Sequence, residues 1–318
     1  MDKKDGILII GDPHLSSRNP GFRKDNYSQV ILDKVDFALQ YSIEHKLLPV
    51  FLGDIFDCPR SNSNALITEL VRLLSKIECC GIYGNHDVTR NSLEDDDSLR
   101  ILIESGCYRL IDSDVNSFWS GFVGGTKCII GGTSWGKQIP REFNPCAIFG
   151  DDYTDAKVIW ITHHDLKFHS DTNKGLGLFE FKGVDAVFNG HIHMKMKEVR
   201  KGTTTWYNLG NISRIRRTDY NREKKPFVTV VRWNSNGLDL KEVKLPTASF
   251  DEVFYPGENY EYETLSISET VQKLSEQNYQ TATGAGLDGM FSNDDFKKMD
   301  PAIQNDIINL KKEVVPDE

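Results

Sequence analysis

The sequence predicts an α/β sandwich, and two observations support this prediction. In the first third of the chain, short apolar runs that end at a glycine alternate with segments whose apolar residues recur at helical spacing. The second half is richer in strand-like segments, most of which end at a glycine or a polar cluster. Open α/β sheets carry their functional residues at the carboxyl ends of strands, so we expect the functional site there.

The first third of the chain predicts the order strand, helix, strand, helix, strand. Residues 7–10 form a continuous apolar run, which is typical of a strand buried on both faces. Residues 28–45 and 64–77 place apolar side chains on one face of a helix. One strand is predicted after each helix, at residues 47–52 and 81–83. These elements together indicate one layer of helices on a sheet.

The second half predicts further strands, most of them bounded by glycine or polar clusters. The candidates are residues 127–131, 158–162, 186–189, 203–209 and 227–233.

The net charge of −9 is concentrated in the last quarter of the chain. Residues 247–318 hold 15 acidic and 5 basic side chains, whereas the preceding residues hold 32 acidic and 33 basic ones. We therefore predict a catalytic domain over residues 1–246 and an acidic accessory segment over residues 247–318. Within this segment, residues 265–277 and 301–313 are candidate helices on either side of a glycine-rich break.

Composition excludes several classes of protein. No apolar run reaches 18 residues, and the apolar run near the N-terminus is too short for a signal peptide, so we expect no membrane association and a cytoplasmic location. None of the six cysteines forms a Cys-x-x-Cys pair, which argues against a zinc–thiolate site. The prediction for the cysteines is free thiols in a reducing compartment.

Five short motifs rich in Asp, His and Asn follow predicted strands, and they carry the functional prediction. They are Gly11-Asp12-Pro13-His14, Gly53-Asp54-Ile55-Phe56-Asp57, Gly84-Asn85-His86-Asp87, Thr162-His163-His164-Asp165 and Gly190-His191-Ile192-His193. Carboxylate oxygens and imidazole nitrogens together suit Mn, Fe, Zn or Co better than Ca. Each motif alone is common in turns, so the prediction of a metal site depends on all five occurring in order.

This ordered set resembles the motifs of the calcineurin-like metallophosphoesterases, over about residues 6–233. The resemblance implies a four-layer α/β/β/α sandwich with two metal ions in its cleft, here with a small C-terminal appendage. The ions implied are two divalent transition-metal ions, Mn²⁺ first, with Fe, Zn or Co as alternatives.

The resemblance also implies a role for each motif residue. Asp12, His14 and His193 would hold the first ion; Asn85, His163 and His191 would hold the second; and Asp54 would bridge the two. His163 is favoured over its neighbour His164 because it lies at the strand end, and His164 would support a ligand or face the substrate.

His86 is, by its family position, a catalytic residue and not a ligand. It would contact the substrate phosphate and help to protonate the leaving oxygen. Asp87 would be catalytic by orienting the His86 imidazole or stabilising its charge, with a cap of the following turn as the alternative. Asp57 would orient a metal ligand through a hydrogen bond, with a cap of its own turn as the alternative.

A narrower resemblance points to DNA. Asp12-Pro13-His14-Leu15 and the segment 207–214 look like the SbcD-type nuclease subunits of double-strand-break repair complexes. The run from Arg214 to Lys225 is basic, and from it we predict Arg214, Arg216 and Arg217 as substrate-binding residues; a solvated loop is the alternative. The resemblance implies DNA as a partner, an SbcC-like ATPase as a second partner, and a homodimer.

Three functions remain open from the sequence. The leading prediction is a two-metal DNA nuclease, exonuclease or endonuclease, acting in DNA repair, recombination or phage-type DNA processing. The first alternative is a phosphatase or phosphodiesterase for a small molecule, a nucleotide or a phosphoprotein, since the same ligands serve these substrates. The second alternative is an inactive scaffold, which the complete set of ligands and His86 argues against.

Overall fold

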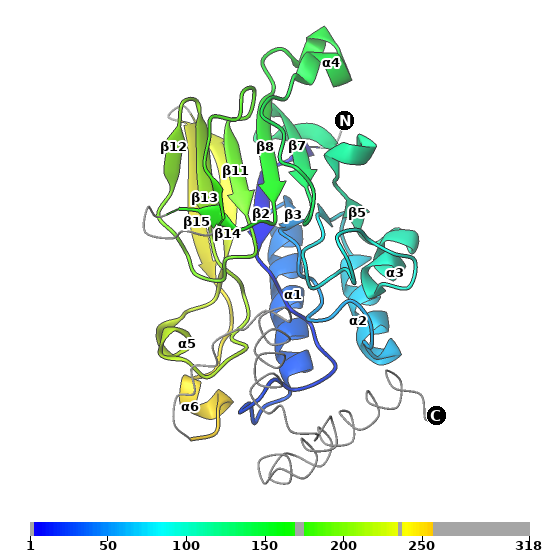
Figure 1. Ribbon diagram of the computed structural model, residues 1–318, viewed down its shortest axis with the longest axis vertical. Helices are drawn as coiled ribbons and strands as arrows, with labels where there is room; N and C mark the ends of the chain where they lie inside the picture. The colour runs from blue at the N-terminus through cyan, green and yellow to red at the C-terminus, as the bar shows by residue number, and fades with distance from the viewer. Residues whose placement is uncertain (1–2, 169–174, 235–236, 257–318) are drawn as a thin grey trace, which may run out of the picture. The chain divides into compact units, whose positions relative to one another are not determined.

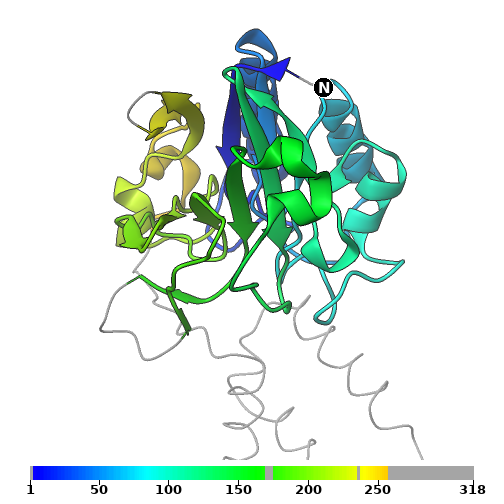
Figure 2. The ribbon, with the colours of Figure 1, turned by 90° about the horizontal axis from the view of Figure 1, so that it is seen from above.

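The computed structural model describes residues 3–168, 175–234 and 237–256. Two sheets pack face to face, and helices cover the outer face of one of them, which confirms the predicted α/β sandwich. Figure 1 shows the green strands β7, β8 and β11 in front of the blue strands of the second sheet, and Figure 2 shows the two layers from above.

The six-stranded sheet has the order β15-β14-β2-β3-β4-β5. Its parallel strands are β2 (Gly6–Ile10), β3 (Leu47–Phe51), β4 (Cys80–Gly81) and β5 (Arg109–Leu110). The antiparallel strands β14 (Phe227–Asn234) and β15 (Gly237–Lys244) extend it beyond β2. The outer face packs against α1 (Tyr27–Glu44), α2 (Asn64–Leu74) and α3 (Ser98–Glu104).

The seven-stranded sheet has the order β1-β6-β7-β8-β11-β13-β12. Its strands are β1 (Lys3–Lys4), β6 (Trp119–Val123), β7 (Thr126–Thr133), β8 (Lys157–Thr162), β11 (Ala186–Asn189), β13 (Thr204–Asn208) and β12 (Val199–Lys201). Strands β7, β8, β11 and β13 run parallel. Its outer face packs against an aromatic cluster that includes partly buried Phe149, at the end of the short helix α4 (Pro145–Phe149).

Smaller elements lie between or after the strands of the two sheets. They are the strand pair β9 (Leu166–Lys167) and β10 (Leu176–Gly177), the helices α5 (Asp219–Glu223) and α6 (Phe250–Val253), and the 3₁₀ turns η1 (Ser113–Val115) and η2 (Asp151–Tyr153).

The continuous apolar runs are explained by burial on both faces of the sheets. In β2, Ile7 and Ile9 face the core between the sheets, while Leu8 and Ile10 face the helices. This alternation follows from the two-residue period of a strand. The predicted strand at 81–83 is shorter in the structure, since β4 covers only Cys80–Gly81.

Residues 247–256 pack on the residues that precede α1. Phe250, Val253 and Phe254 are buried, and the backbone N–H of Lys24 donates to the Val253 carbonyl over 3.0 Å. The start of the predicted accessory segment therefore contacts the catalytic domain. The candidate helices at 265–277 and 301–313 lie outside the described residues. No helix in the described part of the chain is long and apolar enough to cross a membrane.

We predict that a chain ending at Pro246 is less stable than one ending at Pro256. Each buried side chain among Phe250, Val253 and Phe254 contributes about 1.5–3 kcal/mol before the cost of ordering the segment. We expect a net loss of about 2 kcal/mol, which corresponds to a melting temperature lower by roughly 4–8 °C. Calorimetry of both chains measures this difference. Both chains should bind the same number of metal ions, and equal melting temperatures would contradict the prediction.

Candidate metal centre

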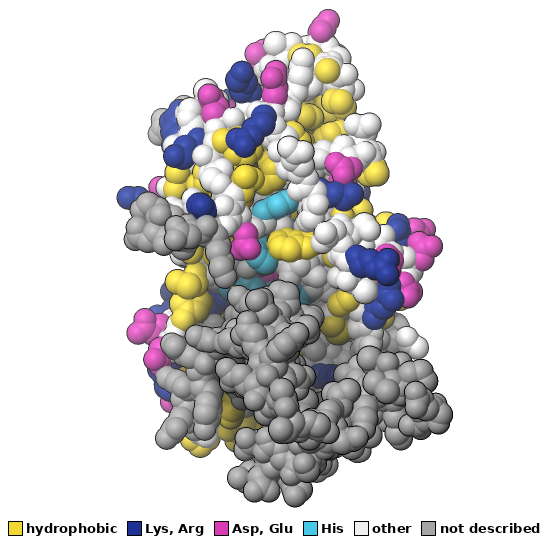
Figure 3. Space-filling view, viewed as in Figure 1, with side chains coloured by type: hydrophobic (Ala, Val, Ile, Leu, Met, Phe, Trp, Pro, Cys, Tyr) yellow, Lys and Arg dark blue, Asp and Glu magenta, His cyan; other side chains and the backbone are white. Residues whose placement is uncertain are grey.

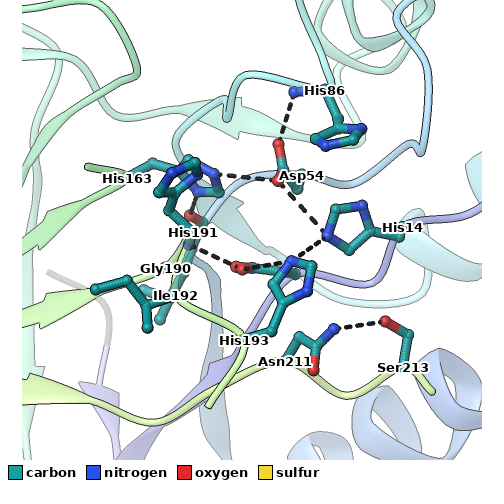
Figure 4. A network of polar contacts seen from close by, with 12 residues as sticks. His14, Asp54, His86, His163, Gly190, His191, Ile192, His193, Asn211 and Ser213 are labelled. Atoms are coloured by element: carbon teal, nitrogen blue, oxygen red, sulfur yellow. Dashed lines mark hydrogen bonds and ion pairs between the residues drawn. The ribbon is translucent and has the colours of Figure 1, made fainter. Parts of the chain in front are cut away.

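The five motifs meet at one edge of the sandwich. Asp12, Asp54 and Asn85 follow the parallel strands β2, β3 and β4 of one sheet, while His163 and His191 follow β8 and β11 of the other. Figure 4 shows Asp54 between the imidazoles of His14 and His163. The motif residues thus lie at strand ends, which is where the sequence analysis placed the functional site.

The backbone bends sharply at four of these residues. Asp12, His14, Asp54 and His191 have φ values of 29°, 50°, 46° and 68°, in the left-handed region that non-glycine residues rarely adopt. Such conformations cost on the order of 1–3 kcal/mol each and persist where the surrounding structure enforces them. The bends turn these side chains out of the strand direction and into the site.

Close packing at Gly84 explains one motif glycine. A Cβ at this position would lie 2.1 Å from Asp54 Oδ1, which no side chain tolerates. Gly84 is therefore required for the third motif to approach the second.

The residues predicted for the first ion lie together. The Nε2 atoms of His14 and His193 are 2.9 Å apart, His14 Nε2 is 3.6 Å from Asp54 Oδ2, and His193 Nε2 is 4.0 Å from Asp12 Oδ2. His14, Asp12 and Asp54 are fully buried or nearly so. Two imidazoles and two carboxylates thus direct ligand atoms at one point.

The residues predicted for the second ion form an adjoining group that shares Asp54. His163 Nε2 is 3.1 Å from Asp54 Oδ2 and 3.2 Å from Asn85 Oδ1, and His191 Nδ1 is 2.9 Å from Asn85 Oδ1. A carboxylate between two groups of ligands is the arrangement that two metal ions require of a bridge.

Two features show that these residues fit divalent cations. Asp12 Oδ1 is buried and accepts no hydrogen bond from the described residues, although buried carboxylate oxygens are almost always paired. His163 Nδ1 donates to the Leu52 carbonyl over 2.7 Å, which leaves the Nε2 lone pair free for a metal. The described residues can therefore hold two divalent ions, and nitrogen with oxygen donors suits transition metals.

His163 and His164 make different contacts in the structure. His164 Nε2 donates to the Lys137 carbonyl over 2.8 Å, and its backbone N–H donates to Asn189 Oδ1. Its ring is therefore engaged with the segment after β7, whereas His163 faces Asp54. This supports His163 as the ligand.

His86 lies beside the first group with a part-exposed ring. Its backbone N–H donates to Asp54 Oδ1 over 2.8 Å, and its Nδ1 donates to the Asp57 carbonyl over 2.7 Å. The Asp57 carboxylate also lies 3.5 Å from His14 Nδ1, in the position to support that ligand. Because Nδ1 is used, His86 offers Nε2 alone to a substrate. Its ring, His14 and Asp57 also form a third group of possible metal ligands.

Asp87 is fully buried, and backbone amides occupy both of its carboxylate oxygens. Phe56 N–H donates to Oδ1 and Gly84 N–H donates to Oδ2, each over 2.9 Å. Burial and the Asp54 charge raise the Asp87 pKa to about 7. Both donors precede Asp87 in the chain, so its carboxylate links the third motif to the second and does not cap the turn that follows.

Arg214 does not lie where the sequence prediction placed it. It is only 4% exposed and donates to the Ala248 carbonyl, so it supports the fold and does not face a substrate. Arg216 is exposed and Arg217 is half-buried. The basic run is therefore only partly available at the surface.

Two residues near the centre were not predicted. Asp165 Oδ1 lies 3.3 Å from His191 Nε2, and the Trp135 ring lies 4.9 Å from the His191 ring. Both follow the ends of central strands, β8 and β7, and this position was the signal that could have identified them.

Charged side chains surround the centre. Figure 3 shows histidine side chains at the surface, with Lys and Arg side chains among Asp and Glu on the side of β12 and a second mixed group on the opposite side. On the other side, a cleft of about 490 Å³ adjoins Asp57, and Arg60 in its wall pairs with Glu94, Asp96 and Asp97.

A comparison with protein families agrees with this geometry. The family model for calcineurin-like phosphoesterases matches residues 6–195. Among solved structures, the chain is similar to a hypothetical protein from Thermus thermophilus, with 13% identity, 76% of this chain and 99% of that chain covered, and a TM-score of 0.41. Among curated proteins there is no match.

We predict that metal affinity rises with pH. Burial lowers the pKa of His163, but the Asp54 charge outweighs this effect and raises the pKa to about 9. In the metal-free protein His163 is therefore protonated at pH 7, and an ion must displace that proton. The affinity for one ion should rise about tenfold per pH unit between pH 6.5 and 8.5. Equilibrium dialysis with Mn²⁺ at several pH values measures this affinity. In His163→Ala, the affinity for the remaining ion should not show the rise with pH that is due to His163. An affinity that does not change with pH would contradict the assignment.

We predict that His86→Ala keeps both ions and lowers turnover by about 10²–10⁴-fold, because His86 would act as a proton donor and not as a ligand. Metal analysis and kinetics on the same preparation provide the measurement. The control is Asp54→Asn, which should lose metal because the shared carboxylate loses its charge. If His86→Ala also empties the site, His86 is a ligand together with His14 and Asp57.

Proposed function

Because the chain belongs to the calcineurin-like phosphoesterase family, we propose that it is a DNA nuclease that hydrolyses phosphodiester bonds with two divalent ions, Mn²⁺ first among them. The observation that carries the hydrolytic part is the pair of ligand groups that share Asp54. When bound in such a pair of sites, divalent ions lower the pKa of a water molecule and neutralise charge on the phosphate oxygens.

The residues of the chain supply orientation and a proton. His86 is held through Nδ1 by the Asp57 carbonyl, and the Asp57 carboxylate lies 4.0 Å from the same nitrogen. With Nδ1 engaged, Nε2 is the ring nitrogen that can carry a proton to the substrate. We propose that this proton passes to the leaving oxygen of the phosphate ester.

The charge distribution supports a polyanionic substrate. Lys197, Arg200 and Lys201 are exposed on and beside β12, directly after the last metal motif, and Arg216 and Lys225 are exposed around α5. On the opposite side, the guanidinium of Arg60 is neutralised by three acidic side chains. A phosphate backbone would therefore bind across the β12 and α5 side of the centre. The SbcC-like ATPase partner, the homodimer and a role in DNA repair stay predictions.

The substrate is tested with the purified protein and Mn²⁺. Linear duplex DNA, single-stranded DNA and a small chromogenic phosphodiester are compared for the unmodified protein and for the double variant Arg216→Ala with Arg217→Ala. We expect DNA hydrolysis to fall about tenfold or more, and the slope of log affinity against log salt to decrease by roughly one to two. Hydrolysis of the small diester should change less than about twofold, because a single phosphate needs few of these contacts.

The matched control is Arg72→Ala with Lys76→Ala, near the end of α2 that points away from the strand ends. This pair should leave all three activities unchanged. Equal loss on DNA and on the small diester in Arg216→Ala with Arg217→Ala would show that these arginines support the fold. Hydrolysis of the small diester without hydrolysis of DNA by the unmodified protein would favour a small-molecule phosphodiesterase.

A further inference from the structure

Three cationic side chains donate to three consecutive backbone carbonyls beside the metal centre. Lys34 Nζ donates to the Ile212 carbonyl over 2.9 Å, Lys224 Nζ to the Ser213 carbonyl over 3.1 Å, and the Arg23 guanidinium to the Arg214 carbonyl over 2.5 Å. The donors come from α1, from the residue that ends α5, and from the loop before α1. We call residues 210–214 the gripped segment.

The gripped segment contacts the backbone on both sides of the first ligand group. Ile212 N–H donates to the Gly11 carbonyl over 3.0 Å, immediately before Asp12, and Asn211 N–H lies 3.4 Å from the His193 carbonyl. A Cβ at Gly11 would lie 2.2 Å from the Gly210 carbonyl oxygen. Figure 4 shows Asn211 next to His193. The segment therefore fills the space between the chain at Asp12 and the chain at His193.

Lys224 links the gripped segment to a ligand directly. Its Nζ lies 3.5 Å from the His193 carbonyl oxygen as well as 3.1 Å from that of Ser213. One ammonium group thus holds the last metal motif and the gripped segment together.

Burial of these cations is costly for the fold. Lys34 is 3% exposed and Arg23 is 6% exposed, and Asp25 forms a close ion pair with Arg23. Burial lowers the Lys34 pKa to about 7, with the charges of Arg214 and Arg23 adding to the effect. Apolar side chains of similar volume would fill the same space without this cost. A role in holding the gripped segment accounts for cations at these positions.

Most contacts of the second ligand group are to other residues, although the His191 backbone N–H donates to Asp12 Oδ2 over 2.8 Å. His163 is fixed by the Leu52 carbonyl, and Asn85 lies between His163 and His191. The gripped segment makes its backbone contacts to Gly11 and His193, on the side of the first group.

We propose that Lys34, Lys224 and Arg23 are positioning residues for the first ion, because they fix the segment that holds Asp12 and His193 in place. This inference rests on the proposed two-ion centre, but it does not depend on DNA as the substrate. The three cations contact the segment beside the first ion. Loss of these contacts should therefore lower the affinity for the first ion and leave the affinity for the second ion unchanged.

The test measures Mn²⁺ binding by equilibrium dialysis without substrate. Lys34→Met and Lys224→Met remove the ammonium group and keep most of the side-chain volume. Contacts that orient metal ligands typically change metal affinity by about 10–100-fold, so we expect the affinity for one ion to fall by at least about tenfold. Lys34→Arg keeps a donor and should restore part of the affinity. The matched control is Lys76→Met, which removes an exposed ion pair with Asp36 and should bind both ions normally.

Single-site backgrounds identify the affected ion. In His163→Ala, which should keep the first ion, Lys34→Met should lower the affinity of the remaining ion by the same factor. In His193→Ala, which should keep the second ion, Lys34→Met should leave the affinity unchanged. If Lys34→Met does not fold, half-buried Lys224 provides the same comparison through Lys224→Met.

Two results would overturn the inference. The first is equal weakening of both ions in step with a lower melting temperature, which indicates a purely structural role. The second is two-ion binding that neither methionine variant changes. If the unmodified protein binds no ion, the proposed function fails, and this result is distinct from either of the other two.

Discussion

The arrangement of the metal centre depends on the Asp54 carboxylate, which both ligand groups share. It follows β3, yet it accepts a hydrogen bond from the His86 backbone and faces His163, which belongs to the opposite sheet. Burial raises the pKa of Asp54, but the neighbouring histidines outweigh this effect and hold the pKa well below its usual range. Asp54 therefore stays ionised within the protein. An ionised, buried carboxylate favours the binding of cations between the two sheets.

This constraint explains why the backbone around the ligands is strained. Ligand atoms from two sheets can meet at one carboxylate only if the chain turns sharply where the strands end. The left-handed residues Asp12, Asp54 and His191 make these turns, and Gly84 removes the Cβ that would collide with Asp54. The backbone at Gly11 also lies close to Gly210, which brings the chain near Asp12 into the same site. Strain and glycine placement are thus consequences of one shared ligand.

The sequence was sufficient to predict the alternation of strands and helices and the strand ends that carry the motifs, because both follow from local patterns. Apolar runs that end at Gly-Asp or Gly-Asn locate the strand ends, and the ends of parallel strands meet. The environment of a single side chain depends on residues far away, and here prediction failed. Arg214 is part of a basic run, but its side chain is buried and donates a hydrogen bond to the Ala248 carbonyl. By contrast, the sequence favoured His163 over its neighbour His164, and their contacts with the carbonyls of Leu52 and Lys137 agree with this choice. Lys34 is one polar residue among several on α1, and its burial follows from contact with Ile212.

The spacing of the first ligand pair has a consequence for folding. His14 and His193 are 179 positions apart in the chain, and their ring nitrogens lie 2.9 Å from each other. An ion held between them would act as a reversible crosslink that closes a very long loop, as a disulfide does in an oxidising compartment. Closing such a loop costs the unfolded chain much of its conformational entropy, so the ion would bind the folded protein almost exclusively. Free metal would then add to the stability of the folded chain in proportion to the logarithm of its concentration.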